Sequence, residues 1–290
     1  MILVTGATGH FGGLVIDSLI EKKVEPSQIS ALVRDSQKAE SLKNRGVNLR
    51  IGNYEDFSSL KRAFEGVDQL LFISGSEIKN RFEQHKNVVE AAKQAGVKHI
   101  VYTSYARNDK PEPSQLGDLA ESHIQTEEKL KNSGVDYTIL QNNLYLDFIP
   151  YFIGDKVLET QTILLPAENG KVSAGLRSEY AEATANVLRS EGHKNKVYRF
   201  TNTQSVNYSD IANMLSEITG KKINYVSPSL DEYVKTLSDA GIPTDFINLF
   251  GSFAVAQAKE ELDVKSNDLE QFLGRKPTSF KDFLINVYGK

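Results

Sequence analysis

The stretch MILVTGATGHFGG, residues 1 to 13, sets the architecture expected for the chain. Its apolar run ends at Val4, and glycines follow at positions 6, 9 and 12, just before a helical segment. Glycines spaced GxxGxxG between a strand and a helix are the context that a dinucleotide-binding fingerprint requires. Gly6 permits the tight turn, Gly9 leaves room for a pyrophosphate, and Gly12 lets the helix pack closely. The stretch predicts a nucleotide-binding loop rather than a plain tight turn.

Short apolar runs alternate with helical segments through residue 141. The helical segments carry apolar residues three and four positions apart. Strict alternation of this kind implies βαβ units and a parallel sheet covered by helices on both faces. The expected fold class is therefore α/β, a Rossmann-type doubly wound parallel sheet. Its strands are expected at 2–5, 29–33, 47–51, 69–73, 99–104 and 136–140.

The rhythm changes after Asn142, where the aromatic segment NLYLDFIPYF begins. We therefore predict an NAD(P)-binding Rossmann domain over residues 1–145 and a smaller α/β substrate or cap domain over residues 146–290. No linker-like segment separates them, so the boundary is soft and some exchange of segments is expected. The later elements are expected to be strands at 162–166, 170–174 and 196–202 and helices at 178–190, 208–220 and 230–241.

Composition excludes several classes of protein. A net charge of -4 argues against a nucleic-acid binder, which normally shows a basic face. The chain has no cysteine, which excludes disulfides, thiolate metal sites and a cysteine nucleophile. Its five histidines are scattered without metal-ligand spacing, so no metal is expected. No apolar run approaches the roughly 20 residues that span a bilayer, and no signal segment is evident. A cytoplasmic protein with no membrane partner is expected.

A second cofactor signal follows the second expected strand, in SALVRDSQK (30–38). An acid at this place accepts a hydrogen bond from the ribose of NAD, whereas an arginine suits the 2′-phosphate of NADP. Arg34 is the first residue after the apolar run, and its planar fork can pair with a phosphate while Lys38 lies one turn further on. A solvated arginine is the plain alternative, and Asp35 keeps NAD open. NADPH is favoured over NAD.

The remaining ligand contacts are expected at other strand ends, because open α/β sheets bind ligands at the carboxyl ends of their strands. Small and hydroxyl side chains there let a ribose approach closely, although each is also an ordinary turn residue. Tyr105, at the end of the fifth expected strand, is a candidate substrate contact. The residues expected to bind the cofactor are Gly6, Thr8, Gly9, His10, Phe11 and Gly12 in the first loop, then Asn53, Ser74, Gly75, Ser76 and Thr103.

Several motifs in order extend the argument to the whole chain. They are GATGHFGG, LVR, LLFISGSE, HIVYTS, SHIQTEEKL, SGVDYTIL and LGRKPTSFKDFL. In this order they resemble the NmrA-like branch of the atypical short-chain dehydrogenase/reductase superfamily. The resemblance implies an NAD(P)H-dependent oxidoreductase that reduces quinones by direct hydride transfer. It also places the nicotinamide near Asn142 and Asn143, and the quinone near Asn143, Tyr145 and Phe148. The alternative for Tyr145 and Phe148 is that their rings are core residues between the domains.

The usual acid–base motif of the wider superfamily is missing. None of the 12 tyrosines is followed by lysine four residues later, and the expected helix carries His123 and Glu127 instead. Alcohol dehydrogenation and sugar epimerisation need that proton transfer and are disfavoured. A quinone accepts hydride to give a stabilised phenolate, so positioning can suffice. His123 is the candidate proton donor. Its alternative role is local helix packing.

Other functions stay open at this point. Some NmrA-like proteins bind a dinucleotide as a signal, so a non-catalytic NAD(P)-sensing regulator is the alternative to a reductase. An azo compound or an enone is an alternative substrate. Gln141 stands where relatives often carry a basic residue, and the loop 106–115 looks extended, which puts the substrate pocket in doubt. Outer helices of such domains often pair, which makes a homodimer the candidate assembly.

Overall fold

The protein is described by a computed structural model covering residues 1–108 and 113–289. Part of the loop 106–115 therefore lies outside the described residues. The chain forms two compact units, each discontinuous in sequence. Unit 1 comprises Met1–Tyr105, Asp118–Asn142 and Ser178–Arg199, and unit 2 comprises Ala106–Gly117, Asn143–Arg177 and Phe200–Lys290.

Unit 1 is built on a seven-stranded sheet with the strand order β3-β2-β1-β4-β5-β6-β8. Neighbouring strands from β3 to β6 pair in parallel; Val4, for example, lies opposite Ala31 on one side and Leu71 on the other. This confirms the expected Rossmann-type α/β class. The strands are β1 (Ile2–Val4), β2 (Ile29–Val33), β3 (Asn48–Ile51), β4 (Gln69–Phe72), β5 (His99–Tyr105), β6 (Asp136–Asn142) and β8 (Lys196–Phe200).

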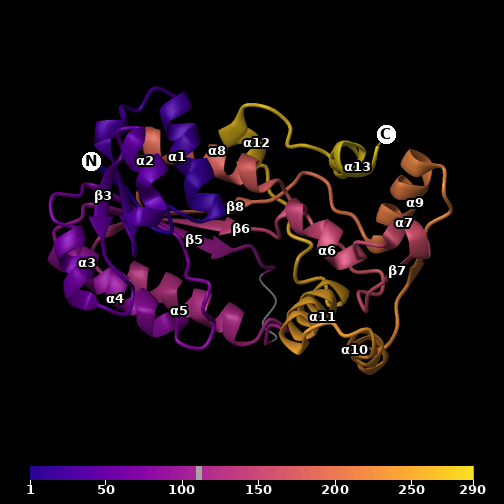
Figure 1. Cartoon of the computed structure of the whole chain (residues 1–290). Helices are drawn as coiled ribbons and strands as arrows, with labels where there is room; N and C mark the ends of the chain where they lie inside the picture. The colour runs from indigo at the N-terminus through magenta and orange to yellow at the C-terminus, as the bar shows by residue number, and fades with distance from the viewer. Residues whose placement is uncertain (109–112, 290) are drawn as a thin grey trace. The chain divides into compact units, whose positions relative to one another are not determined.

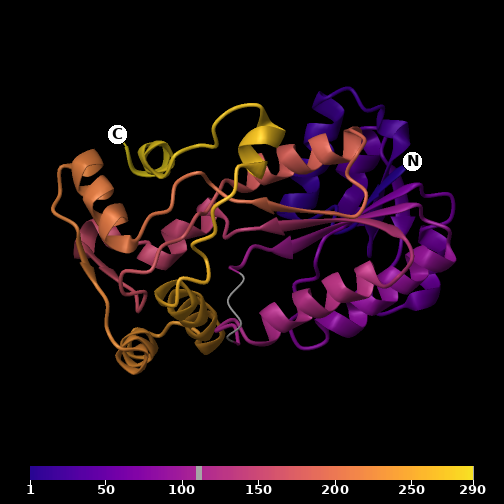
Figure 2. The same ribbon diagram turned by 180° about the vertical axis from the view of Figure 1, so that it is seen from behind.

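Helices cover both faces of this sheet. Figures 1 and 2 show α3, α4 and α5 on one face and α1, α2 and α8 on the other. All five residues of β2 are buried, as expected of a strand covered on both sides. The helices are α1 (His10–Glu21), α2 (Glu40–Asn44), α3 (Phe57–Ala63), α4 (Arg81–Gln94), α5 (Asp118–Lys131) and α8 (Arg177–Arg189).

The strand order reverses at β1. Strands β2 and β3 lie on one side of it, and β4 to β6 lie on the other. In open α/β sheets, ligands bind beyond the carboxyl ends of the strands at such a switch point. The glycine loop that follows Val4 therefore occupies the expected ligand position.

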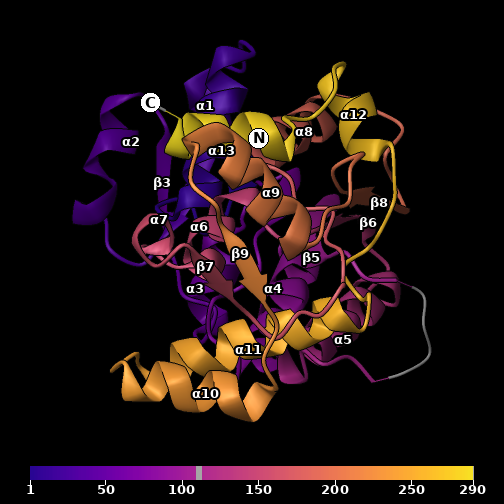
Figure 3. The same cartoon turned by 90° about the vertical axis from the view of Figure 1, so that its right-hand side faces the viewer.

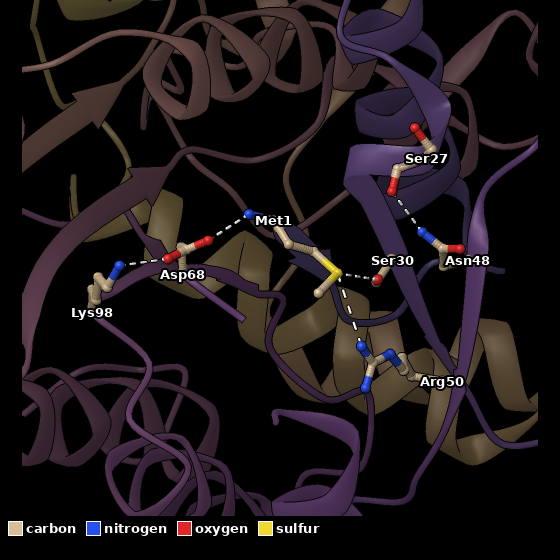
Figure 4. A network of polar contacts seen from close by, with 7 residues as sticks. All are labelled: Met1, Ser27, Ser30, Asn48, Arg50, Asp68 and Lys98. Atoms are coloured by element: carbon tan, nitrogen blue, oxygen red, sulfur yellow. Dashed lines mark hydrogen bonds and ion pairs between the residues drawn. The ribbon is translucent and has the colours of Figure 1, made fainter. Parts of the chain in front are cut away.

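The amino ends of the strands carry a separate ionic network (Figure 4). Asp68, just before β4, accepts from the Met1 ammonium at 2.6 Å and from Lys98 Nζ at 2.7 Å. The hydrogen bond from Lys98, followed by that from the terminal ammonium, lowers the pKa of Asp68 to about 2. The Met1 sulfur also accepts from the Ser30 hydroxyl at 3.0 Å. These contacts tie β1, β2 and β4 together at the end opposite the glycine loop.

Unit 2 has its own apolar core and a two-stranded parallel sheet of β7 (Thr162–Leu164) and β9 (Asn224–Val226). Figure 3 shows α10 and α11 lying side by side. A short 3-10 helix, η3 (Leu146–Phe148), opens this part of the chain. The helices are α6 (Ile149–Ile153), α7 (Val157–Thr160), α9 (Tyr208–Thr219), α10 (Leu230–Asp239), α11 (Thr244–Ala258), α12 (Asp268–Leu273) and α13 (Phe280–Tyr288).

Two late elements differ from the sequence expectation. The strand expected at 170–174 is wrong, because Val172 forms only an isolated bridge with Val206. The next amide, that of Ser173, donates instead to Leu262 at 3.3 Å, so no ladder continues. The strand near 196–202 is present as β8, but it lies beside β6 in the large sheet. A short apolar run predicts a strand without predicting which sheet it joins.

Candidate functional site

A cavity of about 520 Å³ lies at the carboxyl ends of the strands of unit 1. Ten residues predicted from sequence line it: Gly6, Thr8, Gly9, Phe11, Gly12, Arg34, Asn53, Ser74, Gly75 and Ser76. Eight others complete the wall: Leu32, Val33, Gly52, Tyr54, Glu55, Ile73, Glu77 and Gln84. The structure thus brings the loops after β1, β2, β3 and β4 together around one space.

Two positions of the glycine loop, Gly6 and Gly12, favour glycine over any residue with a side chain. Gly6 has a φ of +57°, in the left-handed region that favours glycine. A Cβ on Gly12 would lie 2.3 Å from the Gly6 carbonyl oxygen, and one on Gly9 would lie 3.2 Å from the same atom. The amide of Gly9 donates to that oxygen at 2.9 Å, which closes the turn. The turn is therefore closed by backbone atoms at Gly6, Gly9 and Gly12.

Helix α1 presents its amino end to this loop. Gly9 is its N-cap in extended backbone, and it makes no side-chain cap hydrogen bond because glycine has no side chain. The first turn also carries no acidic residue. The amides at a helix amino end and the positive end of the helix dipole favour an anion. His10, the first helical residue, is exposed and does not line the cavity.

The end of β2 separates the two candidate ribose contacts. Arg34 is exposed and lines the cavity. Asp35 does not line the cavity, and its Oδ1 accepts from the amide of Gln37 at 2.9 Å. Asp35 therefore stabilises the following turn. Of the two residues, Arg34 is the one whose side chain lines the cavity.

Tyr54, which follows β3, joins three strand ends. Its hydroxyl lies 2.5 Å from Thr5 Oγ1, after β1, and donates to the Ile73 carbonyl, after β4, at 2.8 Å. Thr5 Oγ1 accepts in turn from the Ile73 amide at 2.9 Å. Burial raises the pKa of the Tyr54 hydroxyl. The phenol is therefore a neutral, fixed part of the wall.

The loop after β4 is held from behind by residues outside the cavity wall. The Ser74 amide donates to Thr103 Oγ1 at 3.0 Å, and the Gly75 amide donates to His85 Nε2 at 3.1 Å. Thr103, predicted as a cofactor contact, thus supports the loop and does not itself line the cavity. His85 was not among the sequence candidates, since a single histidine in the helical period of α4 carries no signal.

Two carboxylates and an amide form another part of the wall. Gln84 Nε2 donates to Glu77 Oε2 at 2.8 Å and to Glu55 Oε1 at 3.3 Å. Sequence reasoning missed these three residues. Glu55 and Glu77 follow the predicted strand ends closely, which was the available signal. Gln84 lies a full turn inside α4, where only the packing of α4 brings it to the cavity.

The two asparagines at residues 142 and 143 have different environments. Asn142 ends β6, and both polar atoms of its buried side chain lack a hydrogen-bond partner among the described residues. Asn143, in unit 2, donates to the Leu262 carbonyl at 3.1 Å and accepts from the Leu144 amide at 2.7 Å. Unsatisfied buried amides are costly and cluster at functional positions. Asn142 therefore has unused hydrogen-bonding capacity, and Asn143 supports the backbone.

His123 lies on the inner face of α5 and does not line the cavity. Its Nδ1 lies 2.7 Å from the hydroxyl of Tyr102, and its ring is 5.4 Å from that of Tyr105. One turn further, Glu127 is also buried; Ser104 Oγ donates to its Oε1 at 2.5 Å and Gln141 Nε2 donates at 3.1 Å. The two residues that replace the usual acid–base motif are both held in buried polar networks.

The two rings predicted to contact the quinone, Tyr145 and Phe148, belong to unit 2. Their centroids are 5.9 Å apart, and the guanidinium of Arg177 stacks over both, at 4.8 Å and 5.1 Å. Phe148 is 36% exposed and Tyr151 is 68% exposed. The rings are therefore not fully absorbed into the core of unit 2, and they present a flat apolar surface beside a cation.

Residues 1–108 and 113–289 contain no group of three or more histidine or acidic side chains placed to hold a metal ion. No helix in the same ranges combines the length and apolar character needed to cross a bilayer.

Fold and cavity together define a Rossmann-type α/β protein with its ligand space at the switch point of the sheet. The NmrA-like family matches residues 1–284, and the chain belongs to this family. Quinone oxidoreductase 2 of Escherichia coli strain K12 is 36% identical over 289 residues, covering 99% of each chain.

Two solved structures are closely similar. The NADPH-dependent quinone oxidoreductase QOR2 of Escherichia coli, complexed with NADPH, has a TM-score of 0.93 at 35% identity and full coverage of both chains. The triphenylmethane reductase of Citrobacter sp., complexed with NADP(H), has a TM-score of 0.90 at 40% identity and covers 99% of each chain. The likeness therefore extends over both units.

Proposed function

We propose that this protein is an NADPH-dependent oxidoreductase that reduces quinones. The observation that carries the proposal is the cavity whose wall combines the glycine loop, the amino end of α1 and the cation Arg34. Full-length likeness to a quinone oxidoreductase supports the choice of substrate. When bound, NADPH supplies a hydride to the quinone, and a proton completes the hydroquinone.

In this proposal, residues of unit 1 hold the cofactor. The amides at the start of α1 bind the pyrophosphate, and Gly9 leaves the space for it. Gly12 lets α1 approach the backbone of Gly6. Arg34 pairs with the 2′-phosphate, which distinguishes NADPH from NADH. Asn53 and the Ser74 to Ser76 loop contact the nucleoside parts, and Asn142 meets the nicotinamide amide with its unused polar atoms.

The substrate assignments rest on chemistry that a quinone makes easy. Tyr145 and Phe148 stack on the flat ring in this proposal, with Tyr105 as a further contact. His123 delivers or orients a proton, and its link to Tyr102 holds the imidazole in one orientation. Asn143 is assigned to support rather than to chemistry, because both ends of its amide are bonded to backbone.

Loss of NADPH absorbance on adding a small benzoquinone or naphthoquinone tests the proposal directly. Wild type with NADPH is the main arm, and NADH is the parallel arm. A triphenylmethane dye and an azo compound in further arms separate a quinone preference from general hydride transfer to flat acceptors. Fast turnover of the quinone with NADPH supports the proposal. Turnover of the dye or azo compound alone would contradict it and identify that class of compound as the substrate.

Cofactor binding without turnover is the outcome that favours the sensing regulator. NADPH binding is therefore measured separately, from the change in its own fluorescence, since the chain has no tryptophan that would interfere. Binding at micromolar concentration with no oxidation by any acceptor would contradict the enzyme and leave the cofactor assignment intact.

The proposal also includes a location and an assembly. We place the protein in the cytoplasm, where NADPH is available, and infer a homodimer as its assembly. Cell fractionation tests the first point. Light scattering on the purified protein tests the second, since a chain of 32.3 kDa gives about twice that mass as a dimer.

A further inference from the structure

His85 on α4 holds the loop after β4 through a single acceptor. Its Nε2 accepts from the amide of Gly75 at 3.1 Å, and Gly75 lines the cavity. The imidazole itself does not line the cavity, and its side chain is completely buried. We propose that His85 is a positioning residue for cofactor binding, which fixes the Ser74 to Ser76 loop against the cavity. This inference rests on the proposed function.

The hydrogen-bond pattern fixes one tautomer of His85. Because Nε2 accepts from a backbone amide, the ring proton must be on Nδ1. That Nδ1 lies 2.9 Å from Thr126 Oγ1, to which it donates. The Thr126 hydroxyl uses its own proton on the Ser122 carbonyl at 2.7 Å. The chain of donors therefore runs in one direction, from Gly75 through His85 and Thr126 into the backbone of α5.

The surroundings of the His85 ring keep it neutral and pack closely against it. Phe72 packs edge-on against it with centroids 4.8 Å apart, and Tyr54 and Tyr102 flank it at 6.5 Å and 5.7 Å. Burial, with smaller contributions from His123 and Arg81, lowers the pKa of His85 to about 2. A neutral imidazole accepts at Nε2, whereas an imidazolium has no acceptor, so this environment protects the contact with Gly75.

The loop after β4 passes close to α4, so side chains of α4 can hold it. A Cβ on Gly75 would lie 3.3 Å from Gln84 Oε1 and 3.8 Å from His85 Nε2. Its neighbours are held in parallel: the Ser74 amide by Thr103 and the Ser76 carbonyl by Arg81, at 3.5 Å. Of these contacts, that of His85 reaches the central residue of the loop. Its loss frees the middle of the loop and leaves a backbone amide without an acceptor.

Two variants of His85 separate the acceptor from the bulk of the ring. His85→Phe keeps a ring of similar shape and removes the acceptor. His85→Gln offers an amide oxygen at about the reach of Nε2. His99→Phe is the matched control. His99 is a partly buried histidine of unit 1 that is also bonded through both nitrogens, to Gln69 and Thr138, but it lies at the amino end of β5. For each protein, the Kd of NADPH, the steady-state constants and Tm are measured.

We expect His85→Phe to raise the Kd of NADPH about tenfold, the effect of one lost buried hydrogen bond. We expect KM for NADPH to rise by more than kcat falls, and His85→Gln to recover most of the binding. His99→Phe is expected to bind NADPH within about twofold of wild type. A structural role alone would lower Tm for both His85 variants without this order of Kd values.

Two results would overturn the inference. One is a Kd for His85→Phe within about twofold of wild type, and the other is a Kd for His85→Gln as high as that for His85→Phe. If wild type itself does not bind NADPH, the proposed function fails, and that result is distinct from either of these.

Discussion

A Cβ atom on Gly12 would lie 2.3 Å from the carbonyl oxygen of Gly6, closer than any non-bonded contact allows. The first turn of α1 and the end of β1 therefore approach each other at backbone distance. We expect Gly12→Ala to lower the free energy of unfolding by about 1–3 kcal/mol, since backbone must move. NADPH binding should weaken as well, because the glycine loop opens.

Gly13 provides the control for this prediction. A Cβ there would meet Ala7 O at 3.8 Å, an ordinary contact. Gly13→Ala, inside α1, is therefore expected to leave stability unchanged or to raise it by up to about 1 kcal/mol. Thermal unfolding and NADPH titration of both variants check the pair. Equal effects of the two alanines would contradict the assigned geometry of the loop.

Arg34→Ala should separate the two nicotinamide cofactors. Loss of a charge-assisted contact with the 2′-phosphate is expected to raise KM for NADPH about tenfold or more, and to leave KM for NADH within about twofold. Arg45→Ala is the control, because Arg45 is exposed and paired with Asp17 at 2.7 Å. Steady-state kinetics with both cofactors measure the effect. An equal rise in KM for NADH would contradict the pairing of Arg34 with the 2′-phosphate.

Asn142 and Asn143 should respond in opposite ways to leucine. Asn142→Leu removes an amide without a partner among the described residues, so the free energy of unfolding should stay the same or rise by about 1 kcal/mol. Asn143→Leu leaves the Leu144 amide without its acceptor and removes one of two donors to the Leu262 carbonyl, which also accepts from the Ser173 amide. This loss should cost about 1–3 kcal/mol.

Enzyme activity is the second quantity to measure for Asn142→Leu. If Asn142 meets the nicotinamide, Asn142→Leu should lower kcat/KM for NADPH about tenfold in spite of its unchanged stability. Chemical denaturation and steady-state kinetics on the same preparations give both quantities. An Asn142→Leu protein as active as wild type would exclude a ligand role for this side chain.

The buried His85 should make stability depend on pH. Its pKa is about 2 in the folded protein and near 6.5 in the unfolded chain, so between these values the unfolded chain binds the extra proton. The stability is full above pH 6.5 and falls as the pH decreases, by up to about 1.4 kcal/mol per pH unit from this group. Denaturation from pH 7 to pH 5 should show a shallower slope for His85→Gln than for wild type.

Local patterns in the sequence were enough for the class of fold and for most of the cofactor loop. The alternation of short apolar runs with helical segments predicted β2 at 29–33 with its observed bounds. The glycine spacing and Arg34 predicted two parts of the cavity wall, because both depend on residues next to a strand end. Such signals are readable because the backbone conformation and the adjacent side chain are determined within a few residues.

Only the tertiary structure decided how distant segments share the site. Gln84 and His85 reach the cavity and its loop from α4, and β8 joins the large sheet, because helix packing and strand pairing act between residues far apart in sequence. It also separated adjacent candidates: Asp35 from Arg34, and Asn143 from Asn142. In each pair, one side chain is bonded to backbone. Of the others, Arg34 lines the cavity, and Asn142 lacks a hydrogen-bond partner among the described residues. Three-dimensional contacts set this distinction.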